Sequence, residues 1–129
     1  MLLSPSGSVS WLVGLAADVG SVLLFAWLGL LSHDGGGSVR HWLEVAGPFL
    51  IGMLLCWSFT RAWLRPGEIW PTGVLAWLST LVVGMLIRVA TGAGTATSFI
   101  VVAALVLAAL LIGWRLSARV WLRRRVRTG

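Results

Sequence analysis

Residues 98–117 read SFIVVAALVLAALLIGWRLS, and their only charged side chain is that of Arg115. A helix needs about 20 predominantly apolar residues to cross the hydrocarbon core of a bilayer. The apolar residues form a continuous run and do not alternate with polar ones, which favours a membrane helix over a β-barrel strand. This stretch therefore predicts a transmembrane helix and sets the class of fold.

Three similar stretches precede it. They cover about residues 11–32, 43–64 and 72–91, and they are separated by short segments rich in turn-forming residues, such as DGGGS at 34–38 and RPGE at 65–68. Short connections join antiparallel neighbours. We expect an all-α polytopic membrane protein with one integral membrane domain over residues 1–129. Its four transmembrane helices would form a bundle with antiparallel neighbouring helices, followed by a basic C-terminal tail over 118–129.

The overall composition excludes a soluble globular domain. Hydrophobic residues make up 58% of the chain and charged residues 11%, and the mean hydropathy is +0.94, whereas soluble domains have about 25% charged residues. The single cysteine, Cys56, excludes an internal disulfide, and His33 and His41 lack the spacing of a metal motif. No nucleotide loop, nucleophile motif or close pair of carboxylates is present. We therefore expect no metal, no cofactor and no enzymatic activity.

The placement of arginine predicts the orientation. Arg61, Arg65 and the six arginines from Arg115 to Arg127 fall on the side that holds both termini, whereas Arg40 and Arg88 fall on the other. Positive charge is enriched in cytoplasmic segments. We expect a multi-pass protein of a bacterial inner membrane with both termini in the cytoplasm.

The tail carries most of this charge, on Arg119, Arg123, Arg124, Arg125 and Arg127. Each arginine near an anionic membrane surface contributes about 1 kcal/mol to its attraction. We favour contact with anionic lipid head groups over a docking site for a specific partner, and we expect no nucleic-acid binding.

Two opposite charges fall inside the predicted spans. Asp18 lies seven residues after Trp11, which is about 10 Å along a helix. Arg115 lies six residues before Trp121, on a helix that leaves the membrane by the same face. A charge at mid-membrane costs at least about 2.5–3.5 kcal/mol, so the similar depths predict a buried ion pair, with Arg61 as the competing partner of Asp18. Two roles for Asp18 and Arg115 are consistent with the sequence: a purely structural ion pair, or a site for a ligand or ion.

Small and polar residues fall on one face of each span at helical spacing. Small residues let membrane helices approach closely. Four tryptophans lie too deep for an interfacial aromatic belt, and we expect them to serve packing: Trp27, Trp57, Trp77 and Trp114. The predicted helix-packing residues are Gly14, Gly29, Gly52, Gly73, Gly84, Ala104, Ala108 and Gly113.

His33 and Arg88 lie at the opposite end of the spans. His33 is the last residue of the inward face of the first span, and Arg88 is the last residue of that face in the third. One interpretation is the mouth of a polar cavity, in which His33 titrates near neutral pH. The other is loop solvation and helix capping.

Several short motifs resemble those of an uncharacterised family. They are Asp18 in the first span, GLLSH at 29–33, GPF at 47–49 with Gly52, WPTG at 70–73, GMLIR at 84–88, SFI at 98–100 and GWR at 113–115. The family is a domain-of-unknown-function family of small four-span integral membrane proteins from bacteria, notably actinobacteria, and archaea. The resemblance covers most of the chain and implies a four-helix membrane protein without an established activity.

Small multidrug-resistance transporters are similar in layout, with four spans and one acidic residue in the first. Asp18 matches that layout, but the surrounding motif of those transporters is missing and Asp18 has a candidate arginine partner. The arginine bias also argues against dual topology.

Two functions of different classes follow. One is an oligomeric transporter or small-ligand-binding bundle, whose polar line from His33 and Arg88 to Asp18 and Arg115 suits an anionic ligand. The alternative is a non-catalytic membrane subunit or scaffold of a larger complex. We expect a homo-oligomer or a membrane protein partner, and an enzyme acting on lipid is a third hypothesis. The ionisable residues on three inward faces favour the first.

Overall fold

The computed structural model describes residues 10–31, 39–64, 66–92 and 97–128. Helices fill almost all of this part of the chain, and it contains no strand. The long helices are α1 (Trp11–Leu31), α2 (Val39–Thr60), α3 (Val74–Ala90) and α4 (Thr97–Thr128). A short 3-10 turn, η1 (Ala62–Leu64), and a π-helical turn, η2 (Ile69–Gly73), join α2 to α3.

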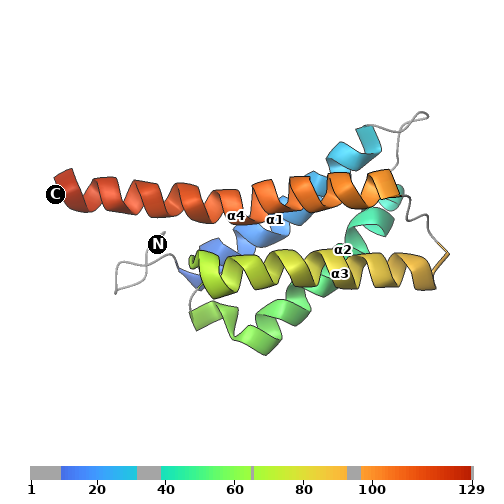
Figure 1. Ribbon diagram of the computed structural model, residues 1–129, viewed down its shortest axis with the longest axis horizontal. Coiled ribbons are helices and arrows are strands. Elements are labelled where there is room, and N and C mark those ends of the chain that lie inside the picture. Colours follow the sequence, from blue (N-terminus) through green and yellow to red (C-terminus); the bar gives the residue numbers. More distant parts are fainter. Residues whose placement is uncertain (1–9, 32–38, 65, 93–96, 129) are drawn as a thin grey trace.

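The four long helices form an antiparallel bundle (Figure 1). Helix α1 contacts α2 and α4, and α3 contacts the same two helices from the other side. Each corresponds to a segment long and apolar enough to cross a membrane. The predicted all-α fold with four such helices is confirmed, and it indicates a multi-pass membrane protein. We call the end at which α1 begins and α4 leaves the bundle the Arg-rich end.

Three helix boundaries differ by four residues or more from the predicted spans, and the first is the start of α2 at Val39, four residues before the predicted residue 43. The second span was expected to run to residue 64, but α2 ends at Thr60 because Arg61 has a φ of 52°, a left-handed conformation that cannot continue a right-handed helix. The fourth span was expected to end at residue 117. Instead α4 continues through the basic tail, in which no glycine or proline occurs before Gly129.

This continuation makes α4 the longest element. Its 32 residues span about 48 Å at 1.5 Å per residue, well beyond the roughly 30 Å of a hydrocarbon core. Figure 1 shows the last turns of α4 projecting past the other helices. The predicted tail is therefore a helical arm, which we call the α4 extension (residues 118–128).

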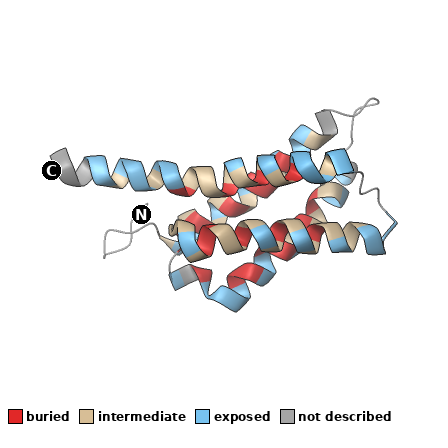
Figure 2. Ribbon diagram, viewed as in Figure 1, coloured by how far each residue is buried: buried red, intermediate tan, exposed pale blue. Residues whose placement is uncertain are grey.

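Buried residues line the inward faces of the four helices (Figure 2). Away from the Arg-rich end, Phe25, Phe49 and Phe99 form an aromatic cluster that joins α1, α2 and α4, with the Phe25 and Phe49 ring centroids 5.0 Å apart. Gly84 of α3 lies directly against the Phe49 ring. Edge-to-face contacts of this kind stabilise a core beyond their buried area.

Close approach accounts for four of the predicted packing glycines. An added Cβ at Gly52 would meet the Ser79 carbonyl oxygen of α3 at 2.7 Å, so α2 and α3 can touch only at a residue without a side chain. Gly14, Gly73 and Gly84 lie equally close to other elements. By contrast, an added Cβ at Gly29 or Gly113 meets no described atom within 4 Å, so these two positions show no close approach of this kind within a single chain.

The predicted inward face of the fourth span consisted of Ala104, Ala108, Leu111 and Arg115, and the structure buries only the last two of these fully. Ala104 and Ala108 are only half-buried, whereas a row at spacings of four is fully buried: Ala103, Leu107, Leu111 and Arg115. Rows at that spacing run obliquely across a helix surface, and packing along them makes helices cross at an angle. The expectation followed an ideal 3.6-residue period along a straight axis, so it included Leu111 and Arg115 but missed Ala103 and Leu107 by one residue each.

Candidate functional site

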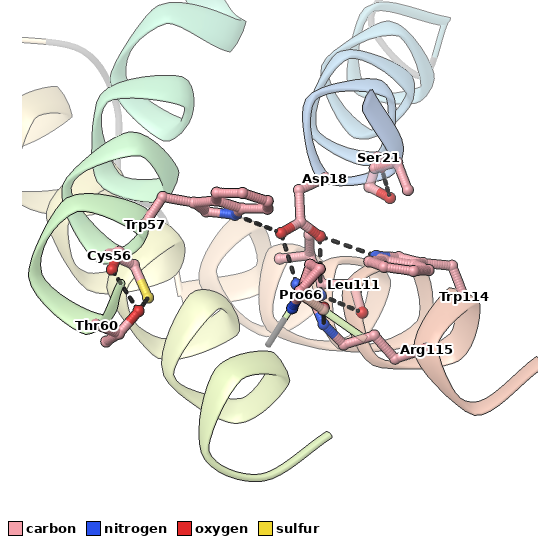
Figure 3. A network of polar contacts seen from close by, with 10 residues as sticks. Asp18, Ser21, Cys56, Trp57, Thr60, Pro66, Leu111, Trp114 and Arg115 are labelled. Carbon is pink, nitrogen blue, oxygen red and sulfur yellow. Dashed lines mark hydrogen bonds and ion pairs between the residues drawn. The ribbon is translucent and has the colours of Figure 1, made fainter. Parts of the chain in front are cut away.

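Asp18 of α1 and Arg115 of α4 form a bidentate ion pair in the interior (Figure 3). The Arg115 Nη2 atom lies 2.7 Å from Asp18 Oδ2, and Nη1 lies 2.8 Å from Oδ1. Both side chains are 0% exposed. The structure thus pairs Asp18 with Arg115, the first of the two partners considered from the sequence, and leaves Arg61 exposed outside the pair.

Two indole groups complete the bonding of the carboxylate. Trp57 of α2 donates its Nε1–H to Asp18 Oδ2 at 2.7 Å, and Trp114 of α4 donates to Oδ1 at 2.8 Å. Each carboxylate oxygen therefore accepts one bond from the guanidinium and one from an indole. Hydrogen bonds to a charged acceptor are roughly twice as strong as neutral ones, so the two indoles help to hold the Asp18 side chain in place.

The guanidinium is equally well bonded on its other sides. Arg115 Nε–H donates to the Pro66 carbonyl oxygen at 2.9 Å, and Nη1 also donates to the Leu111 carbonyl oxygen at 2.8 Å. Four of the five N–H groups of an arginine are thereby assigned to protein acceptors. The guanidinium carbon also lies 4.5 Å from the Trp114 ring centroid, in cation–π geometry.

Local sequence explains how the loop reaches the pair. The left-handed turn at Arg61 redirects the chain after α2, and Pro66 is buried against Gly14 of α1. Gly73 at the end of η2 leaves room for the arginine stem, since an added Cβ would lie 2.8 Å from Arg115 Cδ. The loop between α2 and α3 therefore closes the Arg-rich end of the bundle over the ion pair.

We call Asp18, Arg115, Trp57, Trp114 and Pro66 the sealed cluster. Its members come from α1, α2, α4 and the loop before α3, so it links most elements of the fold. A buried ion pair tolerates desolvation only when its remaining hydrogen-bonding capacity is filled, and removing one partner costs about 3–5 kcal/mol. The cluster meets that condition, and its geometry suits a structural lock.

The other predicted pathway residues do not join the cluster. Arg88 is half-buried near the far end of α3, with its guanidinium carbon 4.5 Å from the Phe99 ring centroid. On α4, the fully buried apolar side chains of Ala103, Leu107 and Leu111 lie between Phe99 and Arg115. His33 lies outside the described residues.

The predicted lipid-contact arginines lie on the α4 extension. Arg119, Arg123 and Arg124 are exposed there, and the side chains of Arg125 and Arg127 lie outside the described part of the structure. Among the described residues, no group of three or more His, Cys, Asp or Glu side chains could hold a metal ion.

Three members of the sealed cluster were missed from the sequence. Trp57 and Trp114 were assigned to packing, although their depth set them apart from interfacial tryptophans. A buried indole N–H needs an acceptor, and Asp18 was an acidic residue predicted at a depth within the spans, so this signal was available. The Pro66 carbonyl was not predictable, because it depends on the turn at Arg61.

Comparison with known protein families identifies a match over most of the chain. A family described as "Protein of unknown function (DUF3054)" matches residues 15–118, which include both charged members of the sealed cluster. No curated protein and no solved structure matches the chain.

Proposed function

The chain belongs to the DUF3054 family, whose function is unknown, and we propose from its own geometry that it is a non-catalytic membrane subunit or scaffold. In this proposal the bundle is a rigid body that acts through its outer surface and its α4 extension. The observation that carries the proposal is the closure of the sealed cluster, in which both charged side chains are 0% exposed.

The hydrogen bonding of the sealed cluster supports a subunit or scaffold over a ligand transporter. An anionic ligand would have to replace Asp18 on Arg115, yet the carboxylate is held by the guanidinium and by two indoles at 2.7–2.8 Å. The buried row Ala103, Leu107 and Leu111 also separates the cluster from Arg88. A continuous polar path through one chain would require both the hydrogen bonds to Asp18 to break and the apolar row to separate from its neighbours.

The outer surface offers two regions for association. Large apolar side chains such as Leu105 and Leu86 are more than 60% exposed along the spans, where lipid or another membrane protein can cover them. The α4 extension presents Arg119, Arg123 and Arg124 beyond the bundle. With both termini in the cytoplasm, these arginines would meet anionic head groups or an acidic surface of the partner.

The test is quantitative copurification after cross-linking in the native membrane. A subunit yields one membrane protein partner in fixed stoichiometry. The double variant Asp18→Leu/Arg115→Met carries no unpaired charge, so it should fold and keep that partner. Asp18→Leu alone leaves Arg115 buried without its counter-ion, and we expect it to be markedly less stable than the double variant and to retain less of the partner.

Two outcomes would count against the proposal. One is a purified homo-oligomer that retains a small anionic ligand, with the ligand lost in the folded double variant. The other is loss of the partner from the double variant despite unchanged helix content and melting temperature, because the pair itself would then act in the interaction.

A further inference from the structure

Helices α1 and α2 border an open groove of about 630 Å³ near the Arg-rich end. It is lined by Trp11, Leu15, Leu54, Trp57 and Ser58. Its volume falls within the roughly 300–1,000 Å³ of small-molecule sites, and its lining is almost entirely apolar. Because both helices are membrane-spanning by length and composition, the groove opens toward lipid acyl chains.

The positions of the lining residues set the depth of the groove. Trp11 is the first residue of α1, and Thr60 is the last of the antiparallel α2, so both lie at the Arg-rich end. Leu54 precedes Thr60 by six residues, which is about 9 Å along the helix. Tryptophan is enriched where membrane meets water. The groove thus runs from the interface into the hydrocarbon region.

A positive charge stands at the interfacial end of this groove. Arg61 follows α2 directly, three residues after Ser58 and four after Trp57, and its side chain is exposed. Because α2 is helical up to Thr60, the Cα atom of Arg61 lies about one turn beyond these two lining residues. A guanidinium at head-group level binds phosphate oxygens well, and Arg61 takes no part in the sealed cluster.

We propose that this groove binds one acyl chain of an anionic phospholipid whose phosphate lies against Arg61. The chain packs along Leu15 and Leu54 and against the Trp57 ring. Since Trp57 donates its Nε1–H to Asp18, the bound lipid covers the outer side of an indole that closes the sealed cluster. The site joins an apolar cleft to a positive charge at its mouth. A zwitterionic lipid matches it only in part, because its own cation offsets the charge of its phosphate.

The test uses the full chain reconstituted in vesicles of equal phosphatidylglycerol and phosphatidylcholine, followed by native mass spectrometry of the released protein. We expect one phosphatidylglycerol to be retained per chain in preference to phosphatidylcholine. Arg61→Gln should lower that preference about fivefold, the effect of one interfacial charge, and Arg61→Lys should keep most of it. Leu54→Trp should fill the groove and remove the retained lipid.

Matched controls use residues outside the lining. Arg119→Gln removes the same charge at the same end of the bundle, and Leu105→Trp adds the same bulk to an exposed position of α4. Both should leave the retained lipid unchanged. If Leu54→Trp fails to fold, the comparison of Arg61→Gln with Arg61→Lys still decides the question.

Three results would overturn the proposal. The first is equal retention of both lipids by the unsubstituted chain. The second is an equal loss of preference in Arg119→Gln, which would indicate diffuse attraction by the arginines together. The third is efficient disulfide cross-linking of two chains through Leu54→Cys in a Cys56→Ser background, because a second copy of the chain would then occupy the groove.

Discussion

At the scale of single residues, the Asp18 carboxylate accepts hydrogen bonds from three side chains. Four donors reach its two oxygens, two from Arg115 and one each from Trp57 and Trp114. Charge-assisted bonds of this kind contribute about 1.5–3 kcal/mol each, whereas neutral ones contribute about 0.5–1.5 kcal/mol. The indoles therefore matter through their N–H groups as well as through their packing.

Tryptophan-to-phenylalanine variants separate these two contributions. Trp57→Phe removes the donor to Asp18 and keeps most of the ring, so we expect a loss of about 2 kcal/mol in the free energy of unfolding. Trp77→Phe loses only a bond to the Ala104 carbonyl oxygen and should lose about half as much. Denaturant titration in detergent micelles measures both, with the half-exposed Trp27 as the control. Equal losses at Trp57 and Trp27 would show that the bond to Asp18 is unimportant.

A glycine substitution tests the space around Arg115. Gly73→Ala places a Cβ 2.8 Å from Arg115 Cδ, and overpacking of this kind typically costs about 1–3 kcal/mol. Gly113→Ala, with no described atom within 4 Å, should be neutral or slightly stabilising because alanine favours helix. Melting temperatures of the purified variants give the comparison. A Gly73→Ala protein as stable as Gly113→Ala would mean that the arginine stem does not occupy this space.

At the scale of elements, the four spans were predictable because hydrophobic length alone specifies a membrane helix. Their ends were not. The end of α2 depends on one backbone angle at Arg61, and the extent of α4 depends on helix propensity in a charged segment. The pairing of Asp18 with Arg115 followed from depth, but the packing row of α4 depends on helix crossing angles, which a single sequence does not encode locally.

The α4 extension gives the clearest prediction at this scale. Removal of residues 119–129 should lower the helix content by about the ten residues from Arg119 to Thr128 that α4 contains there. Far-UV circular dichroism in micelles or anionic vesicles measures this difference against the full chain. An unchanged signal per molecule would show that the extension is not helical outside the bundle.

At the scale of the whole molecule, two layers hold the bundle together. An aromatic cluster joins α1, α2 and α4 toward one end, and the sealed cluster joins the same helices with the loop before α3 toward the other. Membrane helices gain little from the hydrophobic effect once inserted, so packing and polar contacts decide their association. The confirmed membership in a family of unknown function leaves these two layers as the best guide to the protein's role.

The measurement that tests the account most directly is a double-mutant cycle on the ion pair. Asp18→Leu and Arg115→Met are each expected to lower the free energy of unfolding in micelles by about 3 kcal/mol or more, because each leaves one buried charge unpaired. The double variant should lose at least about 2 kcal/mol less than the sum of the two. Additive losses, or single variants as stable as the unsubstituted chain, would contradict a structural lock between Asp18 and Arg115.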